Sequence, residues 1–518
     1  MAKNIYLGGL VIKSKSTYLN SVFLISTIIV GILVIFGAVF PTLFAKGANA
    51  AFGFTTDSFG WFYLISVLLF VVFLVYLAFS KYGKIRLGTD DSRPEYHFFT
   101  WVGMLFSAGF GVGLVFWGIA EPMSHFFTTP IPTYEAQTEE AARLAMAYSF
   151  FHWGVSQWSV FAVVGLIIAY FQFRKKENGL ISTSLSPIIG ETKHTSKIKK
   201  TIDILAVIAT VMGVATSLGL GILQINGGLS SEFGLSDGVG TQLIIVLVLL
   251  ILYLISSTTG LNKGIKWLSN LNLSLALLLM VFVFIAGPTV FILETFTLGL
   301  GDYLTNFVRY SLRVTPYQGG TWVKDWTIFY WAWAIAWSPF VGAFVARVSR
   351  GRTIREFIFG VLIVPPLIAL LWISVFGGTA LHLDLFNGTS IAEAVNNDVT
   401  SALFTTYAEL PFSFLLSVIS IVLIFTFLIT SADSATYILS SMTTGGSLNP
   451  PMGIKIVWGT LIAAIAAVLL IASGLEGLQT ASLVSALPFT IILILMCYTL
   501  FRLLRKEITV KRKKKKKE

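Results

Sequence analysis

The sequence predicts an all-α polytopic membrane protein. Of its 518 residues, 55% are hydrophobic and 12% are charged, and the mean hydropathy is +0.82. Soluble domains carry roughly twice that share of charged residues. Apolar segments of about 20 residues, the length that crosses the hydrocarbon core of a bilayer as a helix, recur along the whole chain. These observations exclude an ordinary soluble protein.

Twelve apolar windows of this length can be placed along the chain. A polar leader with lysines precedes the first window, which is long, so we expect a retained helix and not a cleaved signal peptide. The windows cover residues 20–41, 59–80, 97–119, 143–172, 201–226, 240–258, 269–293, 326–346, 358–378, 411–440, 454–473 and 480–501. The sequence therefore predicts 12 transmembrane helices.

The basic residues predict which side of the membrane each loop occupies, because Lys and Arg gather on the cytoplasmic side. With both termini placed inside, all but five of the 36 lysines and arginines fall in cytoplasmic segments. The predicted outer loops hold most of the acids, including Glu121, Glu135, Glu139 and Glu140. The net charge of +11 therefore reflects topology and a basic tail, and does not indicate a nucleic-acid-binding surface.

Span count and direction predict two inverted halves. The five spans of 97–293 and the five spans of 326–501 run in opposite orientations, an arrangement that supports alternating access around a central site. Residues 1–96 hold the leader and two extra spans, and 294–325 hold an amphipathic helix on the outer face. The basic tail, 502–518, is expected to contact anionic lipid headgroups.

No enzymatic motif is present in the sequence. Cys497 is the lone cysteine, which excludes a disulfide framework and a cysteine metal site. The five histidines show no metal-ligand spacing, and P-loop and nucleophile-elbow sequences are absent. Without a nucleotide-binding domain, the chain cannot drive transport by its own ATP hydrolysis. We expect no enzyme activity and no cofactor.

Two interruptions of apolar windows predict an internal site near the middle of the bilayer. In GMLFSAGFGVG at 103–113, we expect Gly103 to pack and the segment from Gly109 to Gly113 to unwind. The Ser338-Pro339 pair removes a backbone donor inside another window, and lipid cannot replace that donor. We therefore expect a second broken helix, with a simple proline kink as the alternative.

Tryptophans and a phenylalanine cluster in two of these windows. Trp333 and Trp337 are four residues apart, about 40° around a helix. A continuous helix through the fourth window places Trp153, Phe161 and Trp158 at about 0°, 80° and 140°. These rings could form an aromatic box for a cation without N–H donors, at about 0.5–2 kcal/mol per ring. Simple helix packing is the alternative interpretation.

The tenth window carries the polar sequence TSADS at 430–434. Thr430 and Ser431 offer adjacent hydroxyl oxygens, and broken helices free carbonyl oxygens, the ligands that a hard cation such as Na⁺ prefers. Back-bonding of the hydroxyls to the helix is the alternative. Asp433 is the one carboxylate predicted deep in a span, where a charge is costly and usually functional.

Taken together, four segments resemble the betaine/choline/carnitine transporter family, most closely its sodium-coupled glycine betaine carriers. They are WTIFYWAWAIAWSPFVGAFVARVSRGRTIREF at 326–357, the glycine segment at 103–113, HWGVSQW at 152–158 and TSADS. The resemblance covers essentially the whole chain. It implies a leucine-transporter-like fold, two inverted five-helix repeats after two extra helices, in a trimer of the bacterial cytoplasmic membrane.

The resemblance also implies site residues. Substrate would be bound by Trp153, Trp158, Phe161, Trp333 and Trp337, with its carboxylate near the backbone of Gly109, Phe110 and Gly111. A Na⁺ ion would be held by backbone oxygens of Ser107, Phe110 and Phe427 and by the hydroxyls of Thr430 and Ser431. A second Na⁺ site would use Thr210 and Phe340.

The chain departs from the family pattern at three positions. Phe161 stands where a tyrosine is common, and Ala334 where a further tryptophan follows Trp333. Val214 replaces the second threonine of the second sodium site, which puts that site in doubt. We expect Na⁺ symport of glycine betaine first, with choline, carnitine or ectoine as other substrates. A proton-coupled choline or carnitine carrier using Asp433, and an osmotic channel, are the alternative functions.

Overall fold

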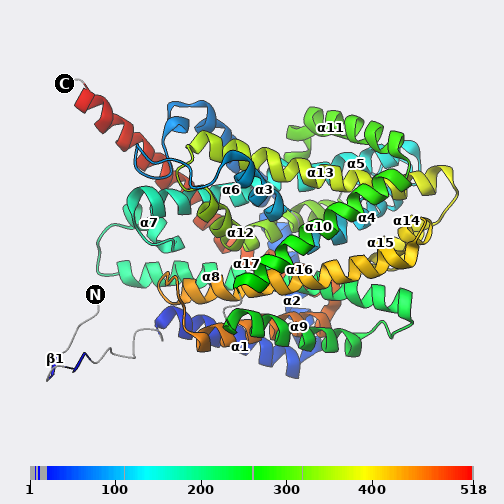
Figure 1. The fold of residues 1–518 in the computed structure, drawn as a ribbon, viewed down its shortest axis with the longest axis horizontal. Coiled ribbons are helices and arrows are strands. Elements are labelled where there is room, and N and C mark those ends of the chain that lie inside the picture. The colour runs from blue at the N-terminus through cyan, green and yellow to red at the C-terminus, as the bar shows by residue number, and fades with distance from the viewer. Residues whose placement is uncertain are drawn as a thin grey trace.

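The computed structural model describes residues 20–109, 111–259, 262–317 and 319–515, together with two short paired strands, β1 (Tyr6–Leu7) and β2 (Leu10–Val11). The described chain is almost entirely helical, and its long helices run mostly along the long axis of the molecule (Figure 1). The all-α polytopic fold class is therefore confirmed.

Seventeen α-helices make up the described part of the chain. They are α1 (Ser21–Val39), α2 (Pro41–Phe79), α3 (Phe98–Gly109), α4 (Val112–Phe127), α5 (Glu139–Trp153), α6 (Val155–Ala169), α7 (Ile181–Ile189), α8 (Thr195–Phe233), α9 (Val239–Thr259), α10 (Asn262–Ala286), α11 (Thr289–Ser311), α12 (Phe329–Val348), α13 (Ile354–Phe386), α14 (Ile391–Asn397), α15 (Ala402–Ala408), α16 (Ser413–Thr443) and α17 (Met452–Lys515). Short helical turns join several of them: η1 (Lys81–Lys84), η2 (Tyr170–Lys175), η3 (Lys324–Ile328) and η4 (Val399–Ser401).

Ten helical segments of the described chain are long and apolar enough to cross a membrane. The difference from the twelve predicted windows has two local causes. The third window is divided into α3 and α4, of 12 and 16 residues, and neither is long enough alone. The last two windows both lie in α17, whose backbone leaves helical geometry at Gly474, with φ 57° and ψ −131°. A positive φ favours glycine, so the sequence marks this change of direction.

The predicted break at Ser338-Pro339 is wrong, because α12 continues through both residues. A proline removes the N–H that would bond the carbonyl four residues earlier, here that of Ile335. The buried hydroxyl of Ser338 donates to that same carbonyl oxygen at 2.7 Å. The side chain thus supplies the donor that the proline lacks, and the helix stays intact in an apolar environment.

A break that the sequence did not reveal lies at Gly154, between α5 and α6. The backbone there has φ −83° and ψ −149°, outside helical geometry. The N–H of Val155, which follows the break, donates to the hydroxyl of Tyr303 on α11 at 2.9 Å. A Cβ at position 154 would lie 2.5 Å from that hydroxyl oxygen, so only glycine lets α11 approach this closely.

This break changes the relation between three aromatic residues. Trp153 is the last residue of α5, whereas Trp158 and Phe161 lie on α6. The angles predicted for one continuous helix therefore do not relate Trp153 to the other two.

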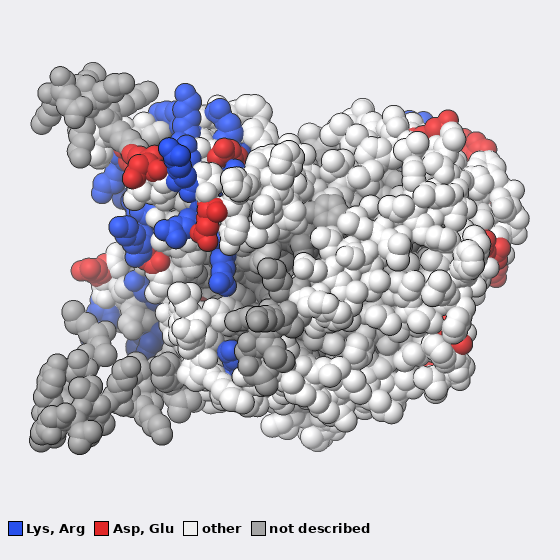
Figure 2. Space-filling view, in the orientation of Figure 1, with Lys and Arg blue, Asp and Glu red and all other residues white. Residues whose placement is uncertain are grey.

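Charge is distributed unevenly along the long axis. Figure 2 shows Lys and Arg side chains gathered at the end where α7 and the C-terminal part of α17 lie, whereas Asp and Glu predominate at the opposite end. This arrangement agrees with the predicted sorting of basic loops to one side of a membrane.

The pairing of Ser338 with Pro339 gives a first prediction. Substituting Ser338→Ala leaves the buried Ile335 carbonyl without its side-chain partner, and we expect the free energy of unfolding to fall by about 1–3 kcal/mol. The readout is the thermal unfolding midpoint of detergent-solubilised protein.

A second substitution serves as the control. In a Pro339→Ala background, the restored backbone N–H can bond Ile335, so the added Ser338→Ala change should cost much less. Equal losses in both backgrounds would show that the hydroxyl does not replace the missing donor.

Candidate functional site

A cavity of about 650 Å³ lies among α4, α8, α9, α10, α12 and α16. Gly111, Gly113 and Trp337 line one part of it, and Arg347 and Lys455 line another. Arg347 follows Trp337 by ten residues on α12, a distance of about 15 Å along a helix. The cavity therefore extends from the interrupted α3–α4 segment toward the basic end of the molecule.

The predicted interruption of the glycine segment is confirmed, but it is shorter than predicted, because Val112 and Gly113 already belong to α4. Helix α3 ends at Gly109 and α4 begins at Val112, and Gly111 between them is extended, with φ −164° and ψ 170°. Phe110 and the side chain of Ser107 lie outside the described residues, and the roles predicted for Ser107, Gly109 and Phe110 remain predictions. Because the first N–H groups of a helix have no intrahelical partners, the start of α4 presents free donors at the break.

The five predicted aromatic residues form one continuous series of ring contacts. Trp158 contacts Phe161 with ring centroids 5.2 Å apart, and Phe161 contacts Trp337 at 5.8 Å. Trp337 stacks on Trp333 at 6.0 Å, and Trp333 and Trp153 form a T-shaped contact at 6.1 Å. The fold therefore brings together rings from α5, α6 and α12. Of the five, Trp337 lines the cavity, and the other four are buried behind it.

The aromatic series packs directly against the glycine segment. A Cβ at Gly113 would lie 2.3 Å from Cη2 of Trp333 and 3.4 Å from Cη2 of Trp153, while one at Gly111 would lie 3.9 Å from Cη2 of Trp337. The absence of a side chain at position 113 is what admits the Trp333 ring.

Ser217 on α8 is a cavity residue that sequence reasoning missed. Its hydroxyl accepts a hydrogen bond from Nε1 of Trp333 at 3.1 Å. Helix α8 comes close to α12 here, since a Cβ at Gly213 would lie 2.8 Å from the backbone of Ala336. A small-residue pattern on α8 is the signal that could have indicated this approach.

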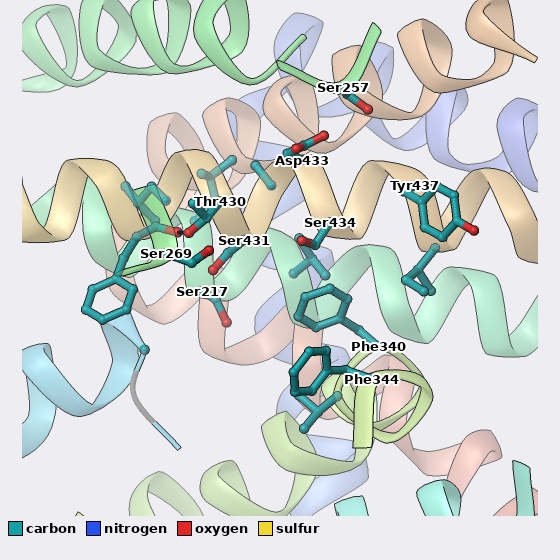
Figure 3. Close-up of a pocket in the computed structure, with 18 of the residues that line it drawn as sticks. Ser217, Ser257, Ser269, Phe340, Phe344, Thr430, Ser431, Asp433, Ser434 and Tyr437 are labelled. Atoms are coloured by element: carbon teal, nitrogen blue, oxygen red, sulfur yellow. Dashed lines mark hydrogen bonds between the residues drawn. The ribbon is translucent and has the colours of Figure 1, made fainter. Parts of the chain in front are cut away.

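The polar face of α16 lies across the cavity from these rings. Figure 3 shows Ser431 and Ser434 pointing toward Ser217 and Phe340. The hydroxyl of Thr430 donates to the carbonyl of Phe427 at 3.0 Å. Phe427, Thr430 and Ser431 all line the cavity, and the Thr430 hydroxyl is back-bonded to its own helix, as the alternative interpretation expected. The cation site itself stays a prediction.

Two residues of neighbouring helices, absent from the sequence prediction, join this polar face. Asn272 on α10 donates to the Thr430 hydroxyl at 3.3 Å, and Ser256 on α9 donates to Oδ2 of Asp433 at 3.0 Å. Asp433 is buried, with 4% of its surface exposed, and lines the cavity. Lys455 also lines the cavity, and its ammonium group donates to the Ser257 carbonyl at 3.1 Å.

The residues proposed for a second sodium site are only partly at the cavity. Phe340 and Val214 line it. Thr210 is fully buried in α8 away from the lining, and its hydroxyl donates to the Ala206 carbonyl at 2.7 Å.

The prediction that Glu121 lies in an outer loop is wrong. It lies inside α4 and is fully buried, so Asp433 is not the one carboxylate deep in a span. Its carboxylate is hydrogen-bonded to Nδ1 of His152 at 2.6 Å and Nε2 of His125 at 3.3 Å. The apolar window ended before this residue, but the Glu121–His125 spacing of four on one helix was a usable signal.

Glu121, His125 and His152 place one ligand atom each within 4.8 Å of one another, which is a geometry that could hold a metal ion. Their spacing in the sequence gave no sign of this, because His152 comes from a different helix. Both carboxylate oxygens already accept hydrogen bonds from protein donors, so a metal ion would have to displace them.

A bundle of long apolar helices, a broken helix in its interior and a cavity running from that break to one end define a membrane transporter. Residues 21–509 match the profile of the betaine/carnitine/choline family of transporters, and the chain belongs to this family.

Curated relatives agree with that membership. An "Ectoine/hydroxyectoine transporter" of Virgibacillus pantothenticus is 66% identical, over 95% of this chain and 98% of the relative. The "Glycine betaine transporter OpuD" of Bacillus subtilis is 48% identical over 95% of both chains. The "Osmo-dependent choline transporter BetT2" of Acinetobacter baylyi is 37% identical over 94% of this chain and 71% of the relative. The protein is thus a secondary transporter of the betaine/carnitine/choline family, and not an enzyme.

The tight contact at Gly113 gives a second prediction. Substituting Gly113→Ala forces the Trp333 ring to move, and overpacking of this kind costs about 1–3 kcal/mol. We expect solute affinity to fall by about tenfold or more, measured as the KM of uptake into proteoliposomes.

Gly103→Ala is the matched control on the preceding helix. A Cβ at this exposed position meets nothing within 4 Å, so uptake should stay close to wild type. Similar KM values for both variants would contradict the role given to the Trp333 contact.

Proposed function

We propose that this protein is a Na⁺-coupled symporter that takes up zwitterionic compatible solutes, with ectoine and hydroxyectoine as the first candidates and glycine betaine as the second. The observation that carries the proposal is the aromatic series packed against the glycine break at the cavity. The resemblance carried by the sequence motifs favours glycine betaine. The relative of 66% identity, named for ectoine and hydroxyectoine, supports placing ectoine first.

The site offers complementary groups for a zwitterion. Aromatic faces attract a quaternary ammonium group or the delocalised cation of ectoine. The start of α4, which follows the extended Gly111, supplies free backbone N–H groups and the positive end of a helix dipole to the solute carboxylate. A solute that carries both charges can therefore bridge the Trp337 ring, which the other four rings support from behind, and the start of α4.

Na⁺ is the proposed coupling ion. Hydroxyl and carbonyl oxygens of Thr430, Ser431 and Phe427 on α16 are the kind of ligand that this hard cation prefers. Carbonyl oxygens near the α3–α4 break would complete the shell. Binding there would link the ion to the segment that also holds the solute.

The proposed setting is the cytoplasmic membrane of a bacterium, with both termini inside. The concentration of Lys and Arg at one end supports this orientation, and it makes the cavity an opening toward the cytoplasm (Figure 2). A homotrimer is the proposed assembly. The exposed apolar side chains Leu298, Leu304 and Val308 on α11 support contact of this helix with lipid or a neighbouring protomer.

A proton-coupled choline carrier is the second candidate function. The observation in its favour is Asp433, a buried carboxylate at the cavity. Carboxylates in membrane helices commonly serve as proton relays.

Uptake into proteoliposomes tests the proposed function. We expect an inward Na⁺ gradient to drive saturable accumulation of labelled ectoine, with excess unlabelled hydroxyectoine or glycine betaine competing more strongly than choline. Accumulation driven by a proton gradient without Na⁺ would favour the second candidate. Non-saturable flux that follows no ion gradient would instead indicate an osmotic channel.

The ion site gives a separate prediction. Thr430→Ala removes one hydroxyl oxygen from the proposed Na⁺ shell, and we expect the half-saturating Na⁺ concentration to rise about tenfold, or about 1.4 kcal/mol. Uptake measured at fixed solute and varied Na⁺ gives this value.

Ser440→Ala on the same helix is the matched control. Its hydroxyl is buried and back-bonded to the Thr436 carbonyl at 2.7 Å, away from the cavity lining. The Na⁺ dependence should match wild type in this variant. An unchanged Na⁺ dependence in Thr430→Ala would remove that hydroxyl from the ion site.

A further inference from the structure

We propose that Glu121 is a positioning residue for the aromatic solute site: its buried carboxylate fixes the rings of Trp153 and Tyr330 and ties together the helices that carry them. The inference rests on the proposed role of the aromatic series in solute binding. It assigns a function to a carboxylate that lies outside the cavity lining and, among the described residues, is hydrogen-bonded to none of the proposed ion ligands.

One carboxylate oxygen holds two rings. Oε2 of Glu121 accepts from Nε1 of Trp153 at 2.9 Å and from the hydroxyl of Tyr330. An indole nitrogen can only donate, so this bond fixes which edge of Trp153 faces the carboxylate. The two rings also contact each other, with centroids 5.7 Å apart.

Both of these rings pack on Trp333, which is central to the aromatic series. Ring centroids are 6.1 Å apart for Trp153 and Trp333, and 6.2 Å apart for Tyr330 and Trp333. Cη2 of Trp153 lies 3.4 Å from the point where a Cβ of Gly113 would stand. A single indole therefore reaches from the Glu121 carboxylate to the glycine segment.

The other carboxylate oxygen of Glu121 is hydrogen-bonded to side chains of two helices. Oε1 is hydrogen-bonded to His152 of α5 and His125 of α4. Nε2 of His152 is hydrogen-bonded to the Thr327 hydroxyl in η3 at 2.9 Å, and its ring stacks on Tyr330 at 4.7 Å. The carboxylate thus joins α4, α5 and the start of α12, the elements that contribute Gly113, Trp153 and Trp333.

Burial makes the arrangement rigid. Glu121 and His152 have no exposed surface, so an indole N–H or a phenol O–H that lost the carboxylate would find no water in its place. A buried donor without an acceptor is costly, and the rings would have to turn to find one. Turning Trp153 disturbs its contact with Trp333, which stacks on Trp337 at the cavity. Loss of the carboxylate is thereby expected to weaken solute binding.

Asp203 provides a matched control. It is also a buried carboxylate, in α8, and it accepts from the backbone N–H of Ser182 at 3.0 Å and its hydroxyl at 2.7 Å. These partners belong to α7 and include no aromatic ring. Asp203→Asn therefore reports the general effect of altering a buried carboxylate.

The experiment measures the KM and maximal rate of ectoine uptake in proteoliposomes. Glu121→Met fills similar space without an acceptor, and Trp153→Phe keeps an aromatic ring without the N–H donor. We expect KM to rise about tenfold or more in the first and about threefold or more in the second, with the maximal rate changed by less than about threefold. Asp203→Asn should leave KM within about twofold of wild type.

Two further variants separate positioning from general destabilisation. Glu121→Gln retains one acceptor oxygen for Trp153 and Tyr330, so its KM should fall between those of wild type and Glu121→Met. Combining Glu121→Met with Trp153→Phe should add little to the effect of Glu121→Met, since the bond between them is already lost.

Several results would overturn the inference. KM values within about twofold of wild type in Glu121→Met and Trp153→Phe would do so, as would fully additive effects in the double variant. If Glu121→Met does not fold, Trp153→Phe and Tyr330→Phe decide the matter in the same assay. Wild-type protein that binds neither ectoine, glycine betaine nor choline would overturn the proposed function together with this inference.

Discussion

The structure depends on one constraint: a backbone polar group inside a membrane must find a partner within the protein. The chain meets it differently at each interruption. At Gly154 the hydroxyl of Tyr303 accepts a hydrogen bond from the N–H of Val155. At Pro339 the hydroxyl of Ser338 replaces the missing donor. At Gly111 the helix starts again beside a cavity, where the free N–H groups of α4 can meet a solute. Two interruptions are therefore repaired, and the third remains available for binding.

The two repaired interruptions lie in the helices that contribute the aromatic series, and the available one lies against that series. Rings from α5, α6 and α12 pack against the α3–α4 break, and the Glu121 carboxylate binds two of the rings beside that series. The cavity extends from the break toward the basic end of the molecule. The hydrogen-bonded group around Glu121, the aromatic series and the cavity therefore follow one another across the molecule. This order is consistent with a transporter whose site is open to one side.

The sequence predicted the structure correctly where the effect of a residue type does not depend on its neighbours. Glycines in close succession predicted the α3–α4 break, because they weaken a helix wherever they stand. It was less informative at Ser338-Pro339, since the effect of the proline depends on whether a neighbouring hydroxyl reaches the freed carbonyl. Gly154 was overlooked because a single glycine does not predict a break. The break there depends on the hydroxyl of Tyr303, about 150 residues away, which accepts the free N–H of Val155. Glu121 was misplaced because the apolar window ended two residues before it, whereas α4 continues to Phe127.

By itself, the sequence determined the all-α membrane fold, the asymmetry of its charges, the broken glycine helix and the identity of the aromatic residues, since hydropathy, charge and backbone freedom are properties of local segments. Only the tertiary structure decided which helices remain continuous, that Trp153 and Trp333 meet over Gly113, and that Glu121 is buried among two histidines, a tryptophan and a tyrosine. Those outcomes depend on contacts between side chains far apart in the chain, and no local pattern specifies such contacts.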